Sequence, residues 1–157
     1  MAHQISAIRR LRRDYLLTGV EIDDASRLAY VEVWPDETRR STTGFLIRAL
    51  RWFKARGVKV ERVMTDNGSG HIAKLFRRTL NRLAIRHIRT RPYTPKTNGK
   101  AERFIQTMLR EWAYAIPFKS SLTREADLPR WLDWYNAKRP HMGIKGKMPL
   151  QALNGTT

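Results

Sequence analysis

Apolar and polar residues alternate in several short stretches of the chain, and these stretches predict β-strands. Residues 15–22 (YLLTGVEI) and 28–34 (LAYVEVW) are rich in aliphatic, aromatic and β-branched residues, and the polar turn at 23–27 between them predicts a hairpin. Pro35 ends the second strand, because proline cannot donate to a sheet ladder. Two further strands are predicted at 58–64 and 86–89.

Helical spacing of apolar residues appears between these strands. Ser41, Thr42 and Thr43 offer N-cap hydroxyls to a helix that runs to about Arg56 and ends at Gly57. A longer apolar stripe repeats at i, i+3, i+4, i+7, i+8 and i+11, which predicts one continuous buried helix face. Its members, following Gly99, are Ala101, Phe104, Ile105, Met108, Leu109 and Trp112. Two further helices are predicted at 72–83 and at about 124–137.

This order of elements predicts a single α/β domain. A hairpin followed by alternating helices and strands implies a mixed sheet with helices on its faces. The 157 residues suffice for one domain with a core of its own, and no repeat, low-complexity tract or long linker divides them.

The net charge indicates a polyanionic partner. With 31 Lys and Arg against 14 Asp and Glu, the chain carries +17, and such a surface repels itself unless a polyanion such as nucleic acid compensates it. Residues 41–100 hold fifteen of these cations and only two acids, so we expect a phosphate backbone there. A basic protein without such a partner is the alternative. An anionic membrane surface is a weaker one, because no basic amphipathic helix has an apolar anchor.

Other classes are excluded by what the composition lacks. The chain has no cysteine, which excludes disulfides, zinc–thiolate sites and cysteine nucleophiles and fits a reducing compartment. No apolar run approaches the roughly 18 residues of a membrane span, and the first residues lack the apolar region of a signal peptide. We therefore expect a cytoplasmic protein, associated with the nucleoid through DNA and not with a membrane.

Asp66 is one of the two acids in the basic segment, and it stands where a predicted strand ends. In α/β sheets this is a favoured place for ligand-binding groups. Asn67 and Gly68 follow it and let the backbone turn sharply, which leaves room for a substrate. The alternative is an Asp-Asn-Gly turn that binds nothing.

Glu102 lies in the first turns of the long helix predicted from Gly99, one position from its apolar stripe. It can therefore lie at the edge of the core and still face outward. The alternative is a surface ion pair with Lys100 or Arg103. Together, Asp66 and Glu102 place two carboxylates inside a basic surface, which suits a metal-bound phosphodiester: the acids hold Mg²⁺ or Mn²⁺ while the cations hold DNA.

Four segments in order resemble the DDE family of retroviral integrases and bacterial insertion-sequence transposases. They are IDDASRLAYVEV (22–33), VMTDNGSG (63–70), IRHIRTRPYTPKTNGKAERF (85–104) and WYNAKRPH (134–141). The resemblance covers about residues 14–153. It implies that residues 1–157 form one catalytic core domain with an RNase H-like fold, a five-stranded mixed sheet flanked by helices. It also implies a two-metal site and a homo-oligomer that joins two DNA ends.

The resemblance further implies roles for single residues. Asp66 and Glu102 match the second and third acids of the family, which are metal ligands, and residues 92–99 match its mobile active-site loop. Asn67, Gly68 and Gln106 are expected to support the carboxylates, since Gln106 and Asn98 each lie four residues from Glu102. Tyr93 is either a packed residue or a stacking contact for a base. The expected DNA contacts are Arg89, Arg91, Lys96, Thr97, Asn98, Lys100 and Arg103.

The sequence departs from the family at the first acid. The segment expected to form the first strand, residues 3–11, holds no Asp or Glu. Asp14 is a weak substitute, and Asp23 and Asp24 are poorer ones because they belong to the opposite end of the sheet. We interpret the chain as a shortened or degraded copy, and residues 1–13 cannot hold the helix-turn-helix region that related transposases carry.

Three functions follow from this pattern. The first is a metal-dependent DNA transesterase, and the second is a non-catalytic DNA-binding remnant that lacks the first acid. The third is a basic nucleic-acid-binding structural protein, which leaves the paired acids unexplained. In the WYNAKRPH segment we expect core, capping and bracing roles and no ligand at His141. Trp131, Trp134 and Tyr135 are the predicted core residues there, and Asn136 and Arg139 are predicted to cap or brace the helix end.

Overall fold

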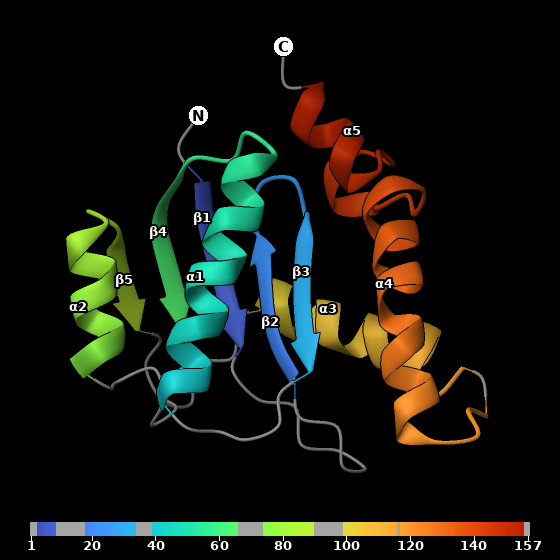
Figure 1. Ribbon diagram of the computed structural model, residues 1–157. Helices are drawn as coiled ribbons and strands as arrows, with labels where there is room; N and C mark the ends of the chain where they lie inside the picture. The colour runs from blue at the N-terminus through green and yellow to red at the C-terminus, as the bar shows by residue number, and fades with distance from the viewer. Residues whose placement is uncertain are drawn as a thin grey trace.

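The computed structural model describes residues 3–8, 18–33, 39–65, 74–89, 99–115 and 117–155. Their strands form one five-stranded sheet in the order β3-β2-β1-β4-β5 (Figure 1). The strands are β1 (His3–Ile8), β2 (Thr18–Asp23), β3 (Ala29–Val33), β4 (Val60–Thr65) and β5 (Arg86–Arg89). β1, β2 and β3 pair antiparallel, whereas β4 and β5 run parallel to β1. The predicted mixed sheet of five strands is confirmed.

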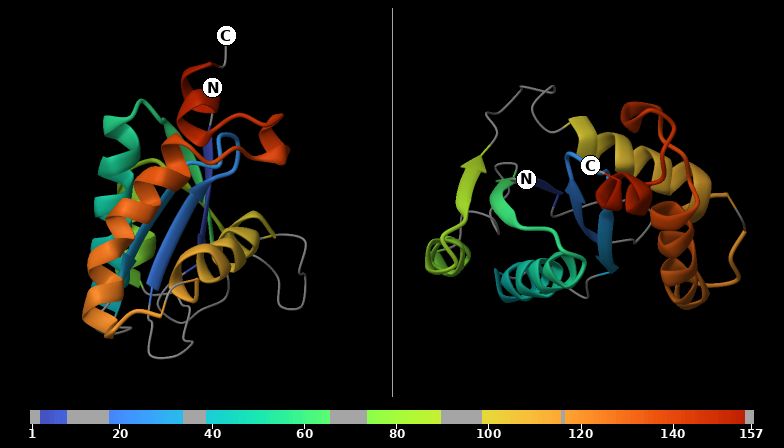
Figure 2. Two further views of the ribbon diagram at one scale, coloured as in Figure 1. Left: turned by 90° about the vertical axis from the view of Figure 1, so that its right-hand side faces the viewer. Right: turned by 90° about the horizontal axis from the view of Figure 1, so that it is seen from above.

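Helices cover both faces of this sheet. Two of them lie on one face and α3 lies on the other, while α4 packs beside the edge strand β3 (Figures 1 and 2). The helices are α1 (Arg39–Ala55), α2 (Lys74–Arg82), α3 (Gly99–Met108), α4 (Ser121–Ala137) and α5 (Pro149–Asn154). A π-helical turn, Leu109–Ala113, continues α3, and a short 3-10 helix, Met142–Ile144, follows α4.

Two apolar clusters hold the layers together. On the α3 side, Val20 and Ile22 of β2 pack against the helix stripe predicted from the sequence, and every member of that stripe is buried. On the α1 and α2 side, Phe53, Val63 and Phe76 belong to a second cluster. Because side chains alternate along a strand, the residues of β2 that lie between the members of the first cluster point toward the second cluster, on the other face of the sheet.

Several predicted boundaries are wrong. α1 begins at Arg39, so 41–43 lie inside its first turn and are not its N-cap; arginine is a good helix former and extends the helix backwards. β4 begins at Val60, two residues later than predicted, and α4 begins at Ser121 with Ser120 as its N-cap. The helix α5 was not predicted at all, because six residues are too few to show a helical period.

Within the described part of the chain, no helix is long and apolar enough to cross a membrane.

Candidate functional site

The carboxyl ends of three parallel strands meet at one edge of the sheet. Thr65, the last residue of β4, pairs with Ala7 of β1 on one side and with Arg89 of β5 on the other. Thr65 is fully buried, and its Oγ1 lies 2.7 Å from Nε2 of His87, in a hydrogen bond that joins β4 to β5. The sheet therefore fixes the residue that immediately precedes Asp66, and it places Arg89 beside that residue.

Asp66, Asn67 and Gly68 lie outside the described residues, as do Arg91 and Lys96 to Asn98. Their predicted roles as metal ligands, supporting residues and DNA contacts therefore stay predictions.

The first strand is confirmed at His3–Ile8, and the residue that pairs with Thr65 is an alanine. A carboxylate at this position would lie one strand away from the end of β4, but Ala7 has none. Asp14, the substitute considered from the sequence, lies outside the described residues.

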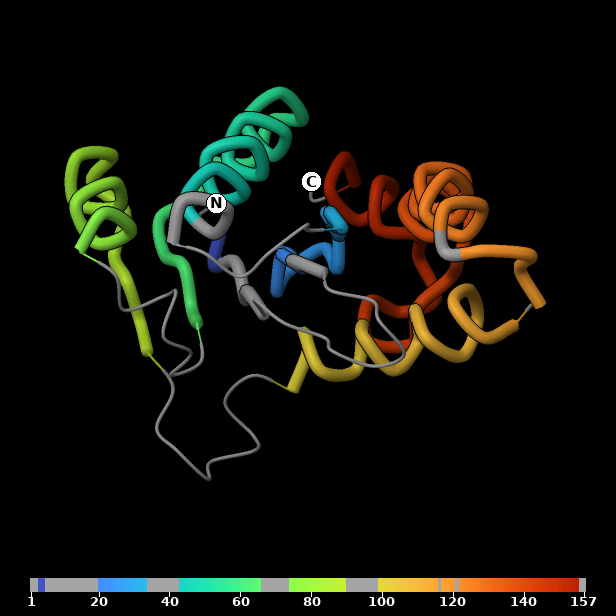
Figure 3. Tube along the Cα trace, turned by 60° about the horizontal axis from the view of Figure 1, so that its bottom comes forward, coloured from blue at the N-terminus to red at the C-terminus, as the bar shows by residue number. Residues whose placement is uncertain are grey.

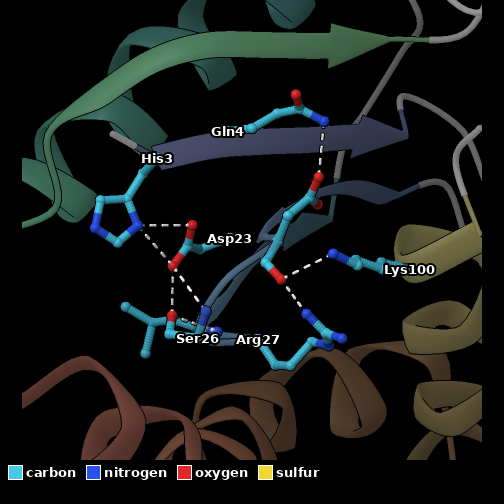
Figure 4. Close-up of polar contacts among 8 residues, drawn as sticks. His3, Gln4, Asp23, Ser26, Arg27 and Lys100 are labelled. Carbon is cyan, nitrogen blue, oxygen red and sulfur yellow. Dashed lines mark hydrogen bonds and ion pairs between the residues drawn. The ribbon is translucent and has the colours of Figure 1, made fainter. Parts of the chain in front are cut away.

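Asp23 and Asp24 lie at the opposite end of the sheet, as predicted. The backbone nitrogen of Asp24 donates to the carbonyl of Gln4, near the amino end of β1, and the side-chain amide of Gln4 donates to the Asp24 carboxylate (Figure 4). The buried carboxylate of Asp23 lies 2.9 Å from Nδ1 of His3 and accepts a 2.6 Å hydrogen bond from Ser26 Oγ. These bonds hold the β2–β3 turn to β1, so Asp23 has a structural role.

α3 carries the second predicted metal ligand. Ala101, Phe104 and Ile105 anchor its first turns in the core, whereas Glu102 is exposed. Gln106, one turn further on, is exposed as well, so the two side chains lie in one row, as the spacing predicts.

The basic neighbours of Glu102 do not neutralise it. Glu102 forms no ion pair with any described residue. Lys100 instead donates from Nζ to the backbone carbonyl of Asp24 at 3.1 Å (Figure 4), and Arg103 is exposed. The surface ion pair considered from the sequence is therefore not formed with Lys100 or Arg103, and the carboxylate is available to a cation.

Lys100, Glu102, Arg103 and Gln106 are all exposed on α3, but Lys100 and Glu102 are two residues apart and point to different sides of the helix. The structure does not bring Arg89 to them, because β5 is the far edge strand whereas α3 packs against β1 and β2 (Figures 1 and 3).

Glu21 is a buried acid that sequence reasoning missed. It pairs with Ala7, in the same row of the sheet as Thr65, and only 1% of it is exposed. Burial, and secondly the negative charge of Glu32, raises the pKa of its carboxyl well above the ordinary value, and its Oε2 has no hydrogen-bond partner within the described structure. Val20 and Ile22 face α3, so Glu21 faces α1, away from Glu102. Helices cover both faces of the sheet and bury this carboxylate.

The WYNAKRPH segment supports the scaffold, with two corrections. Trp131 and Tyr135 are buried as predicted, but Trp134 is 39% exposed. Asn136 does not cap the helix end: its Oδ1 accepts from Ala29 N and its Nδ2 donates to Ala29 O, each at 2.9 Å. It bonds there because β3, as an edge strand, presents unpaired backbone groups.

Arg139 and His141 end this segment. Arg139 braces the end of α4, as predicted, through two 2.8 Å bonds to Glu111. Its Nη1 also donates to Nδ1 of His141 at 3.3 Å, and burial, together with the positive charges of Arg139 and Arg27, lowers the pKa of His141 to about 4. His141 is therefore neutral at physiological pH. Among the described residues, no group of three His, Cys, Asp or Glu could hold a metal ion.

Comparison with known proteins places this architecture in a family. Two models described as "Integrase core domain" match, one over residues 7–95 and the other over 83–149. The chain belongs to the integrase core domain family.

The relatives include transposases of Escherichia coli. The putative transposase InsD for insertion element IS2E (strain K12) is 30% identical over 90 residues, which are 57% of this chain and 41% of the relative. Transposase InsD for insertion element IS2D shows the same identity over 30% of its length. The matched part thus spans less than half of these relatives.

Solved structures show the same fold. The catalytic core domain of BIV integrase superposes with a TM-score of 0.76 at 20% identity, over 98% of this chain and 95% of that one. A simian T-cell lymphotropic virus intasome chain gives 0.77 at 22% identity, over 96% and 54%. The HTLV-2 integrase catalytic core domain in complex with magnesium, in a trimeric form, gives 0.69 at 20% identity, over 96% and 94%. The predicted RNase H-like fold is confirmed.

Proposed function

We propose that this chain is the DNA-processing core of an insertion-sequence transposase, which cleaves DNA strands and transfers them with the help of divalent metal ions. The observation that carries the proposal is the exposed carboxylate of Glu102 on α3, which forms no ion pair within the described part of the chain although Lys100 and Arg103 flank it in sequence, in a core of the integrase family. A carboxylate held free of these cations on a basic surface is suited to a metal ion and to the phosphates that the ion attracts.

The donor set fits Mg²⁺ or Mn²⁺. Mg²⁺ is commonly held by one or two carboxylates, with water and substrate phosphates completing its coordination. Asp66 and Glu102 are the proposed ligands, with Asp14 a weak third candidate because β1 carries no acid beside Thr65. When bound, such ions polarise the phosphodiester and stabilise the attacking and leaving oxygens.

The alternation of β4 supports the pairing of the two acids. Thr65 bonds to His87, whose ring lies 5.3 Å from that of Phe76 on α2, so Thr65 faces the α1 and α2 side. Side chains that alternate with Thr65 along a strand face the other side, on which α3 lies, and we propose that the Asp66 carboxylate acts on that side together with Glu102. The chain's own task is then to hold the two carboxylates and to place the DNA backbone against Lys100 and Arg103.

The proposed partner is DNA, bound by more than one copy of the chain. The relatives are named as transposases, and one structural neighbour is an intasome. Joining two DNA ends requires two sites in one assembly, so we expect self-association on DNA, which sedimentation of the protein with and without a duplex measures.

The function is tested by nicking of supercoiled plasmid in Mn²⁺. Wild type is compared with Glu102→Gln and with a matched control, Glu61→Gln, which makes the same charge change at an exposed position of β4. We expect nicking by wild type and the control, and none by Glu102→Gln. If wild type binds DNA in a salt-dependent manner but never nicks it, the chain is a non-catalytic DNA-binding remnant and the proposed chemistry is wrong.

A further inference from the structure

A basic groove lies between α3, the β2–β3 turn and the segment that follows α4. Its volume is about 910 Å³, and its walls are α3 with the following π turn, the β2–β3 turn and the segment after α4. Figure 3 shows that segment, drawn in red, returning alongside α3. We call this the α3 groove. Its charged lining residues are Asp24, Arg27, Lys100, Arg103, Arg110 and Arg139.

Most of the positive charge in the α3 groove is uncompensated. Arg139 is neutralised by Glu111, but Arg103 and Arg110 are exposed and form no ion pair with any described acid. Arg27 and Lys100 both donate to the backbone carbonyl of Asp24, a contact that orients the two cations without neutralising them (Figure 4).

The remaining groups in the groove leave that charge intact. The one lining carboxylate, Asp24, also accepts a 2.8 Å hydrogen bond from Gln4. Counted over its described lining residues, the groove therefore keeps a positive excess that an anionic ligand would offset.

The spacing of the cations fits a chain of phosphates. Lys100, Arg103 and Arg110 follow one another along the helix, and at a rise of about 1.5 Å per residue the outer two are about 15 Å apart. One strand of nucleic acid carries a phosphate about every 3.4 Å along a duplex axis, so the row matches roughly four phosphates. Of the two rings that line the described groove, Tyr135 is buried and offers no face for base stacking, and His141 packs edge to face against it at 4.7 Å. The lining thus suits a backbone and does not read bases.

We propose that the α3 groove binds the sugar-phosphate backbone of DNA, which runs from the β2–β3 turn and the adjacent first turn of α3 along the helix to Arg110. This inference rests on the proposed function for its choice of polyanion, and it adds a binding surface that the motifs do not indicate. Arg27 and Arg110 are each more than four residues from Glu102, so its sequence motif does not include them. The β2–β3 turn, which holds Arg27, lies at the opposite end of the sheet from Thr65.

The test is binding of a fluorescent DNA duplex, followed by anisotropy over a range of salt concentrations in EDTA so that catalysis plays no part. Arg110→Glu is compared with Arg78→Glu, the same charge change at an exposed position of α2 on the other face of the sheet. Each phosphate contact contributes about 0.9 to the slope of log K against log salt concentration. One contact therefore accounts for about a fivefold fall in DNA affinity when the salt concentration rises from ~0.15 M to ~1 M. We expect Arg110→Glu to lose at least about fivefold in affinity and about one unit of slope.

Arg110→Lys keeps the charge and should bind as wild type does, whereas a purely structural role of Arg110 would not be rescued in this way. If Arg110→Glu does not fold, Arg110→Gln with a normal melting temperature takes its place and should lose the same unit of slope. Equal binding by the Arg110 and Arg78 variants overturns the α3 groove and leaves the proposed function standing. Absence of any DNA binding by wild type overturns both.

Discussion

Asn136 joins α4 to the edge of the sheet, and its removal is the sharpest test of how the fold is held together. Its side-chain amide makes two hydrogen bonds of 2.9 Å to the backbone of Ala29, 107 residues away, and all the partners are buried. β3 has no strand on its outer side, so the amide takes the place of one residue of a further strand. Asn136→Ala leaves a backbone N–H and a C=O without partners.

The cost follows from those two groups. Each buried group left unsatisfied costs about 1–3 kcal/mol, and water reaching an edge strand favours the lower values. Alanine returns about 0.5 kcal/mol because it is the better helix former. The expected loss in the free energy of unfolding is therefore about 2–3 kcal/mol, against a total of about 5–15 kcal/mol for a domain.

Urea unfolding measures this loss. With a slope of about 2 kcal/mol per molar, the midpoint should fall by about 1–1.5 M. The matched control is Asn81→Ala, which changes an exposed asparagine of α2 and should stay within about 0.5 kcal/mol of wild type. Asn136→Asp retains an acceptor for the N–H but has no donor for the C=O, so it should not restore stability. A loss below about 1 kcal/mol in Asn136→Ala would show that the two bonds do not hold β3.

One half-buried and one buried titratable group predict opposite pH dependences of stability. His141 has a folded-state pKa of about 4, below its ordinary value, so the unfolded chain binds the proton first and stability is full above about pH 6.5. The shift alone corresponds to about 3 kcal/mol, and solvent screening of the half-buried ring reduces the expected loss toward pH 4 to about 1–2 kcal/mol. His141→Gln should flatten that part of a melting-temperature profile, and an unchanged profile would contradict the neutral imidazole. Glu21 has a raised pKa, so its contribution is full below the ordinary carboxyl pKa and is lost as pH rises through the folded value. Glu21→Gln should therefore melt higher than wild type near neutral pH, with the difference shrinking toward pH 4; a lower melting temperature at pH 7 would contradict this.

Local patterns were enough to predict most elements of this fold. The stripe on α3 is buried in full because helical periodicity and burial are both properties of one short segment. The parallel direction of β4 and β1 follows from the order of strands and helices. It places Thr65, the residue before Asp66, at the carboxyl ends of the parallel strands. The resemblance of the four segments to integrases and transposases supplied the topology that periodicity alone left open.

The sequence by itself thus determined which segments form strands and helices, which helix face is buried, and that the surface is basic. Only the tertiary structure decided the surroundings of single polar groups. The burial of Glu21 against α1 was not predicted, and Asn136, which was expected to cap or brace a helix end, bonds to β3 instead. The α3 groove combines Arg27 with Arg110, which lie far apart in the chain. Contacts of this kind depend on how separate elements pack, and short-range periodicity carries no information about that packing.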